Sequence, residues 1–212
     1  MPQRIGWFCL ALIAVWQVMA PGSPALAEPA GVTDDEKSDA GHRFRFGLGL
    51  QLGSGFRAIS PFDDEYCGDT EGGGNASTCL GRTPFQLGVI ASYGVSASVE
   101  VIAEIALGLE KDFGASLSSG AGPRLIAFAP GIRGYLAEVG PGRVFATLQF
   151  WADFADYAQR PGNDYGIRNL FGVLFDVHDQ IGAYVYVGEN IAWERWLSFG
   201  IEGGIGVQGR LP

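Results

Sequence analysis

The stretch RFRFGLGLQLGSGF, residues 43–56, carries the pattern that decides the fold. Its phenylalanines and leucines fall on one parity, while its arginines, its glutamine and its glycines fall on the other. Because successive side chains of a β-strand point to opposite faces, this stretch is predicted to be a strand with one apolar and one polar face. A soluble sheet shows the same pattern, so the rest of the chain must indicate whether the polar face is enclosed.

The alternation returns in later segments, and together they predict eight strands. Residues 98–110 also suit a helix, because Glu100, Glu104 and Gly108 are four apart. The neighbouring strands and a tight turn at residues 94–96 favour a strand there. The predicted strands are residues 43–56, 84–94, 98–110, 123–136, 143–156, 165–177, 181–189 and 196–211.

Long and short connections alternate between the predicted strands. The long ones are residues 58–83, 111–122 and 157–164, and the fourth loop, residues 190–195, is short for its class. An up-and-down transmembrane barrel shows this asymmetry, with short periplasmic turns and longer extracellular loops. The predicted fold class is therefore all-β, an eight-stranded antiparallel up-and-down transmembrane β-barrel over residues 42–212.

The N-terminal 27 residues predict export. A basic start, an apolar run over residues 5–20 and an A-x-A motif ending at residue 27 form the pattern of a signal peptide, cleaved before Glu28. A membrane anchor is the alternative, but the apolar run is shorter than the ~20 residues of a spanning helix. Residues 28–41 are polar and aperiodic, and we expect a flexible periplasmic lead-in.

Composition excludes some classes of protein. The net charge of −9 argues against a nucleic-acid partner. After residue 27 no run of 18 apolar residues occurs, which excludes a helical membrane protein.

In an exported protein Cys67 and Cys79 are expected to form a disulfide, because two cysteines without a nearby histidine make a poor zinc site. The acidic residues of the same loop do not match an EF-hand, so we expect no metal and no cofactor.

Charged residues collect on the polar parity of the strands, whereas Asn169 is a lone polar residue on the apolar parity. A charge facing lipid costs about 2–4 kcal/mol at the bilayer midplane, so these residues are expected to face the lumen and to pair there. An eight-stranded barrel is just wide enough for side chains to fill it, which predicts no open pore. The predicted ion-pair network consists of Arg45, Glu100, Glu104, Arg133, Asp153, Arg168, Asp176 and Glu202.

Aromatic residues cluster near the predicted strand ends and suggest two belts at the membrane interfaces. The belt residues on the loop side are Phe56, Phe113, Tyr157, Tyr165, Trp193 and Trp196, and those on the turn side are Phe44, Tyr93, Tyr135 and Phe175.

Strand count, alternation and charged lumen together make residues 42–212 resemble the small eight-stranded outer-membrane barrels, the OmpA-like and OmpX-like superfamily. The resemblance implies this barrel fold and a place in the outer membrane of a Gram-negative bacterium. One difference is that the chain ends Gly209-Arg210-Leu211-Pro212, without the C-terminal aromatic residue that such barrels usually carry.

The expected function is that of a non-enzymatic, monomeric barrel in outer-membrane lipid, which serves envelope integrity or surface interaction. It would meet an extracellular ligand through loops 58–83, 111–122 and 157–164. One alternative is a soluble lipocalin-like periplasmic barrel that binds an apolar ligand, with the two faces reversed. Others are a narrow channel for small hydrophobic compounds and a barrel enzyme that modifies lipid A, for which His42 and His178 are the histidines available as a base.

Overall fold

The computed structural model describes residues 44–60, 78–112, 124–156, 162–178 and 180–211. The predicted signal peptide, the lead-in, His42, Cys67, Phe113 and Tyr157 lie outside these residues, and the Cys67–Cys79 disulfide stays a prediction. None of the described residues forms a helix long and apolar enough to span a bilayer. Eight strands are present: β1 (Phe46–Ser60), β2 (Cys79–Gly94), β3 (Val99–Lys111), β4 (Arg124–Val139), β5 (Gly142–Asp153), β6 (Asp164–His178), β7 (Ile181–Ala192) and β8 (Leu197–Leu211).

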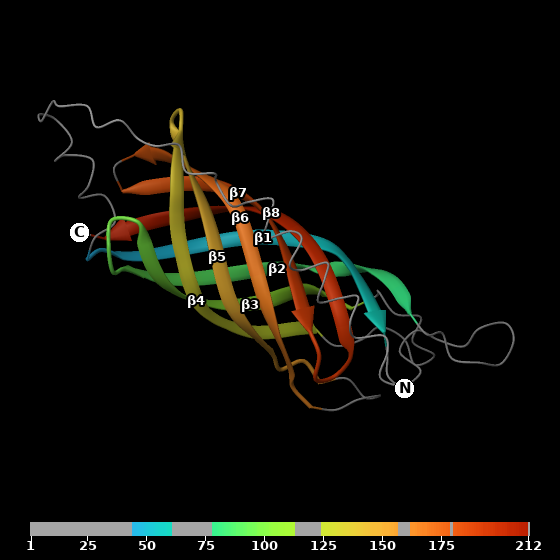
Figure 1. Cartoon of the computed structure of the whole chain (residues 1–212). Helices are drawn as coiled ribbons and strands as arrows, with labels where there is room; N and C mark the ends of the chain where they lie inside the picture. Colours follow the sequence, from blue (N-terminus) through green and yellow to red (C-terminus); the bar gives the residue numbers. More distant parts are fainter. Residues whose placement is uncertain (1–43, 61–77, 113–123, 157–161, 179, 212) are drawn as a thin grey trace, which may run out of the picture. The chain divides into compact units, whose positions relative to one another are not determined.

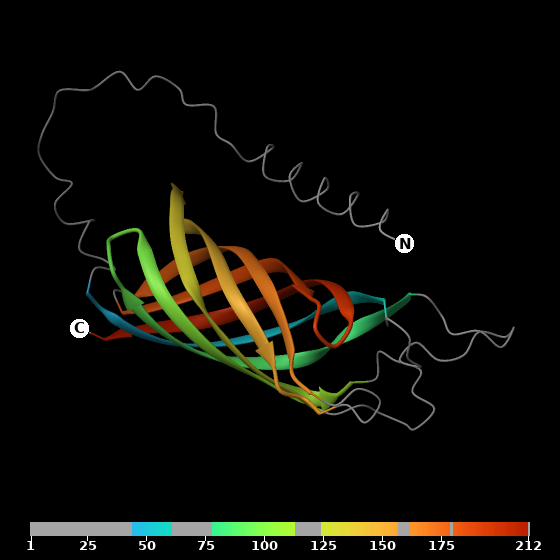
Figure 2. The same ribbon diagram turned by 60° about the horizontal axis from the view of Figure 1, so that its bottom comes forward.

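The strands form a closed ring in chain order (Figures 1 and 2). Each pairs antiparallel with the next, and β8 closes the ring on β1, from Phe46 opposite Leu211 to Ser60 opposite Leu197. Closure leaves no sheet edge, so the strands satisfy one another's backbone hydrogen bonds, as a hydrocarbon environment requires. The predicted eight-stranded transmembrane barrel is confirmed. The helical alternative for residues 98–110 is wrong, because β3 pairs with both β2 and β4.

Successive connections between the strands alternate between the two ends of the barrel. The turns β2–β3, β4–β5 and β6–β7 lie at one end, here the turn end, together with the start of β1 and the end of β8. Gly140, in the β4–β5 turn, has a positive φ of 58°, which glycine adopts without strain. The other connections lie at the opposite end, here the loop end.

Three strands run further toward the loop end than the alternation predicts. β1 continues to Ser60 and β2 begins at Cys79, so the predicted loop 58–83 is too long. A β-bulge near Gly53 and Gly55 interrupts the alternation of apolar and polar residues. The sequence pattern therefore does not predict the paired residues that follow the bulge. β7 likewise continues to Ala192, because residues 190–192 of the predicted fourth loop pair with both β6 and β8.

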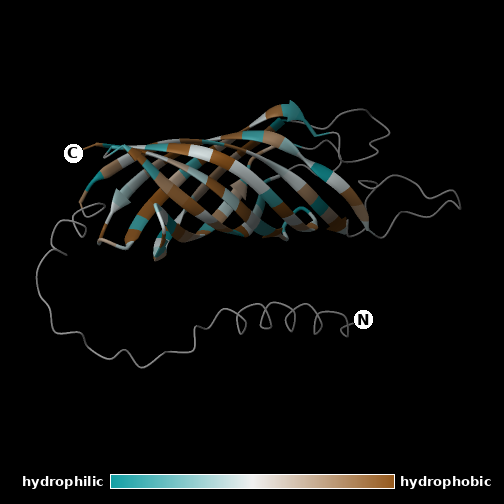
Figure 3. Ribbon diagram, turned by 90° about the horizontal axis from the view of Figure 1, so that it is seen from above, coloured by the Kyte–Doolittle hydropathy of each residue, from teal (hydrophilic) through white to brown (hydrophobic). Residues whose placement is uncertain are grey.

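The outer surface of the barrel is apolar and the interior is polar. Large hydrophobic side chains are exposed on all eight strands, including Leu50, Val185 and Ile205. Figure 3 shows hydrophobic and hydrophilic residues alternating along the strands. An apolar surface that encircles the molecule suits lipid and not water. The soluble barrel with reversed faces is therefore wrong.

A charge on this surface should destabilise the barrel according to its depth. We expect Ile205→Arg, near the middle of β8, to lower the free energy of unfolding by about 2–4 kcal/mol, and Leu80→Arg, at the loop end of β2, to lower it by about 0–1 kcal/mol. Both side chains are exposed outward, at 61% and 83%. Urea unfolding in lipid vesicles measures both values. Equal losses would contradict a membrane-spanning orientation.

Candidate functional site

The centre of the lumen is an arginine held between two carboxylates from other strands. The Arg168 guanidinium, from β6, donates from Nη1 to Glu104 Oε2 of β3 at 2.9 Å and from Nε to Glu202 Oε1 of β8 at 2.5 Å. The three side chains are at most 1% exposed. The guanidinium carbon also lies 5.0 Å from the centre of the Trp151 ring, a cation–π contact. Three residues of the predicted network therefore meet at the centre of the lumen, each from a different strand.

Glutamines complete the hydrogen bonds of both carboxylates. Gln51 and Gln149 donate to the two oxygens of Glu104, at 2.7 and 2.9 Å, and Gln86 donates to Glu202 Oε2 at 3.0 Å. A buried ion pair is tolerated only when its remaining lone pairs find donors, and these amides provide them. The predicted network omitted the glutamines, although their place on the inward parity was the signal that could have found them.

A second cluster lies nearer the turn end, around Arg133 of β4. The guanidinium donates from Nη1 to Gln208 Oε1 at 2.7 Å and lies 3.9 Å from Glu100 Oε2. It also lies against two aromatic rings that meet edge to face, with its carbon 4.8 Å from the centre of the Phe145 ring and 5.4 Å from that of Tyr184. The predicted pair of Arg133 and Glu100 is thus brought together, with Gln208 as the closer partner.

At the turn end Asp176 of β6 lies between two arginines. Its Oδ1 accepts from Arg210 at 3.0 Å and its Oδ2 accepts from Arg143 at 2.5 Å. Neither arginine belongs to the predicted network. Arg45, which does, precedes β1 and forms no ion pair with any described residue.

The loop end of the lumen has its own polar cluster. Arg195 donates to Asp153 Oδ2 at 3.1 Å and to the carbonyl oxygens of Ala155 and Gly162 at 2.5 and 2.6 Å. Asp164 Oδ1 accepts from the backbone N–H of Arg195 at 3.0 Å. Only Asp153 was predicted here, because Arg195 and Asp164 lie in stretches without alternation.

A cavity of about 70 Å³ opens into this loop-end cluster. Arg57, which pairs with Asp112, lines it together with Arg195 and Trp196. Gln86 and Trp151 also line the cavity, and both contact the central cluster. The cavity has room for a few water molecules and ends at the Arg168 layer.

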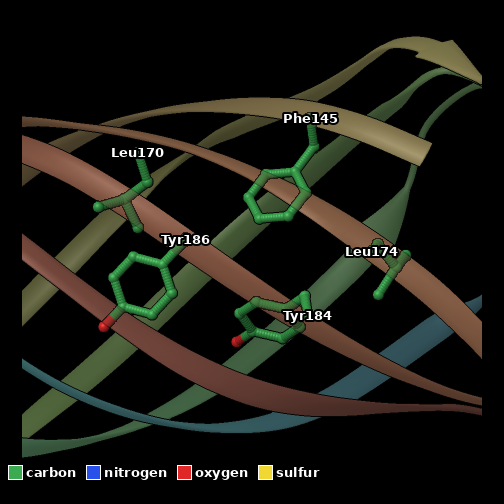
Figure 4. Packing of buried hydrophobic residues seen from close by; sticks show 5 residues of the cluster. All are labelled: Phe145, Leu170, Leu174, Tyr184 and Tyr186. Atoms are coloured by element: carbon green, nitrogen blue, oxygen red, sulfur yellow. The ribbon is translucent and has the colours of Figure 1, made fainter. Parts of the chain in front are cut away.

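Apolar side chains fill the rest of the lumen. Figure 4 shows Phe145 of β5, Leu170 and Leu174 of β6, and Tyr184 and Tyr186 of β7 packed together. Glycines face the tyrosine rings: a Cβ at Gly53 would lie 2.2 Å from Tyr186 Oη, and one at Gly206 would lie 2.2 Å from Tyr184 Cζ. Large residues on one wall are therefore matched by glycines on another, which lets the narrow interior close.

Two residues of the predicted aromatic belts point inward instead. Trp196 is only 3% exposed, with the Arg195 guanidinium 5.6 Å above its ring, because it precedes the outward Leu197 and so takes the inward parity. Tyr135 shares the parity of Arg133 and packs against the apolar cluster of the lumen. The other described belt residues lie wholly or partly exposed on the outer surface: Phe56, Tyr165 and Trp193 at the loop end, and Phe44, Tyr93 and Phe175 at the turn end.

No protein-family model matches the chain, and no curated protein matches it in sequence. Solved structures do match. Neisserial surface protein A is 12% identical with a TM-score of 0.50, and the match covers 78% of this chain and 97% of that one. The N-terminal β-barrel domain of Pseudomonas aeruginosa OprF is 8% identical (TM-score 0.48, 77% and 97% covered), and Ail, the attachment invasion locus protein of Yersinia pestis, is 9% identical (TM-score 0.47, 80% and 100% covered).

The likeness to Neisserial surface protein A confirms the barrel fold predicted from the strand pattern. At 12% identity the likeness to Neisserial surface protein A concerns the fold alone.

Removal of the central arginine should lower the free energy of unfolding far more than removal of a surface arginine. Arg168→Met leaves Glu104 and Glu202 buried without their cation, and we expect a loss of about 3–5 kcal/mol in the free energy of unfolding. The control is Arg82→Met, which breaks an exposed pair with Glu110 and should leave the free energy of unfolding nearly unchanged, because water screens exposed charges. Neutralising both acids in the Arg168→Met background (E104Q, E202Q) should recover most of the loss. Urea titration in vesicles measures all three, and an unchanged value for Arg168→Met would contradict the pairing.

Proposed function

We propose that this protein is a non-enzymatic outer-membrane barrel with a sealed lumen, which holds its connecting loops at the cell surface and does not conduct solutes. The observation that carries the proposal is the complete burial of Arg168 between Glu104 and Glu202, on strands from different sides of the ring. A water-filled passage would have to break both ion pairs. Such a break leaves charges unpaired in a narrow interior, which is energetically costly.

Packing on both sides of this layer supports a closed state. Toward the loop end, the cavity stops at Gln86 and Trp151. Toward the turn end, Arg133 and its two rings fill the lumen, and Asp176 joins two further arginines below them. The same packing argues against a narrow channel for small hydrophobic compounds.

An outer-membrane location in a Gram-negative bacterium fits the barrel type and the predicted signal peptide. The turn end, where both ends of the barrel lie, would then face the periplasm, and the loop end would face outside. Outer-membrane lipid would contact the apolar outer surface. The loop-end connections would serve envelope integrity or contact with an extracellular ligand.

We propose no catalytic role for the chain. A hydrolytic barrel enzyme needs a nucleophile beside a base. His178 lies exposed near the β6–β7 turn, where its Nδ1 accepts from the backbone N–H of Gln180 at 3.5 Å. That position does not support the lipid A-modifying alternative.

Electrical recording tests the sealed lumen. In planar bilayers the folded protein should produce no discrete conductance steps, whereas a variant with its central layer truncated (R168S, E104S, E202S) should produce them. Folding of both is checked by faster gel migration before boiling than after. Regular steps from the unaltered protein would overturn the proposal.

Surface display of the loops is tested by epitope insertion. An epitope placed between β1 and β2, within residues 61–77, should be detected by antibody on intact cells. The matched insertion at residues 140–141, in the β4–β5 turn, should be detected only after the outer membrane is permeabilised. The reverse result would invert the proposed orientation.

A further inference from the structure

A polar pair interrupts the apolar outer surface of β6 and β7. Asn169 and Glu189 stand opposite each other in register, and Asn169 Nδ2 donates to Glu189 Oε1 at 3.4 Å. Both are partly exposed and share the outward parity of their strands. Apolar residues flank the pair along both strands, namely Ile167 and Phe171 on β6 and Val187 and Ile191 on β7.

The pair lies at a depth where lipid headgroups do not reach. Asn169 follows the outer-surface aromatic Tyr165 by four residues, and Glu189 precedes Trp193 by four. With a rise of about 3.4 Å per residue and a strand tilt near 40°, the pair lies roughly 10 Å below these aromatic residues. A carboxylic acid at such a depth is costly, and acids found there usually have a partner.

The contact within the chain leaves hydrogen-bonding capacity unused. One long bond from the Asn169 amide occupies a single oxygen of Glu189. Among the described residues, neither the second oxygen of that carboxyl nor the second amide hydrogen of Asn169 has a hydrogen-bond partner. The pair thus offers one donor and one acceptor, side by side, toward the membrane.

We propose that Asn169 and Glu189 form the centre of an interface between two copies of this chain, where the sequence alone predicted a monomer. A two-fold axis that passes between the residues places each Asn169 against Glu189 of the partner subunit. Each carboxyl then accepts from two amides, and all four groups leave the lipid. A donor and an acceptor opposite each other on neighbouring strands are self-complementary under this symmetry, which favours a second copy over an unrelated cationic partner.

The surface beside the pair suits close approach. Gly203 of β8 lies opposite the outward Val187, and an added Cβ there would come no nearer than 3.5 Å to any neighbouring atom. Ser54 of β1 lies opposite Gly203, so these two small residues form a low strip on the outer surface. Next to it Val187 and Ile201 are strongly exposed. Small residues let membrane-embedded segments approach closely, so the exposed side chains of one copy can pack on the low strip of the other.

Energy transfer between labelled copies in phosphatidylcholine vesicles tests the interface, with association measured as the protein-to-lipid ratio varies. Asn169→Glu places two acids on each face and should weaken association roughly tenfold or more. The exchange of the two residues (N169E, E189N) retains the donor and the acceptor and should restore association. Glu189→Leu should weaken association without lowering the urea midpoint of unfolding.

A photo-crosslinking amino acid locates the contact. At position 187 it should yield crosslinked dimers, whereas at position 107, on β3 across the ring and also exposed outward, it should not. Heat-dependent gel mobility confirms that each variant is folded. Energy transfer at the level of random mixing, association unaffected by Asn169→Glu, or equal crosslinking from both positions would each overturn the proposal. These outcomes do not depend on whether the lumen conducts.

Discussion

Closure of β8 onto β1 is the constraint on which the rest of the structure depends. A membrane core offers no water to an unpaired backbone group, so a sheet can cross it only as a ring without edges. Once the ring is closed, every strand residue is either outside or inside, and the alternation assigns each to one side. The apolar exterior and the polar interior are two consequences of one closure.

The interior resolves the difficulty that closure creates. Eight strands enclose little space, and the inward parity delivers charged residues into it. The charges are arranged in successive layers, around Arg195, Arg168, Arg133 and Asp176, and in each layer an arginine meets a carboxylate. Amides saturate the central carboxylates, and tyrosines facing glycines fill the remaining volume. Ion pairs, amides and aromatic rings together occupy the centre of the polar lumen.

The exterior follows the opposite rule. Outward side chains are mostly apolar along the strands, with aromatic residues toward both ends. Asn169 and Glu189 depart from this rule together, in register, and they carry the proposed contact between copies. In a surface selected for lipid, such a paired departure is better explained by a partner than by chance.

The sequence by itself determined the strand count, the face to which most residues belong, and the segregation of charge to one parity. These properties depend on the two-residue period of an extended chain, which is local. The alternation did not predict the strand ends at Ser60 and Cys79, because the bulge in β1 interrupts it. It also did not predict the inward Trp196, because this residue precedes β8 and lies at the edge of the alternating stretch. Only the tertiary structure decided that Arg168 takes Glu104 and Glu202, that Arg195 caps the loop end, and that Asn169 meets Glu189. Such pairings depend on strand register and on the stagger of the closed ring, which all eight strands set together and no single segment encodes.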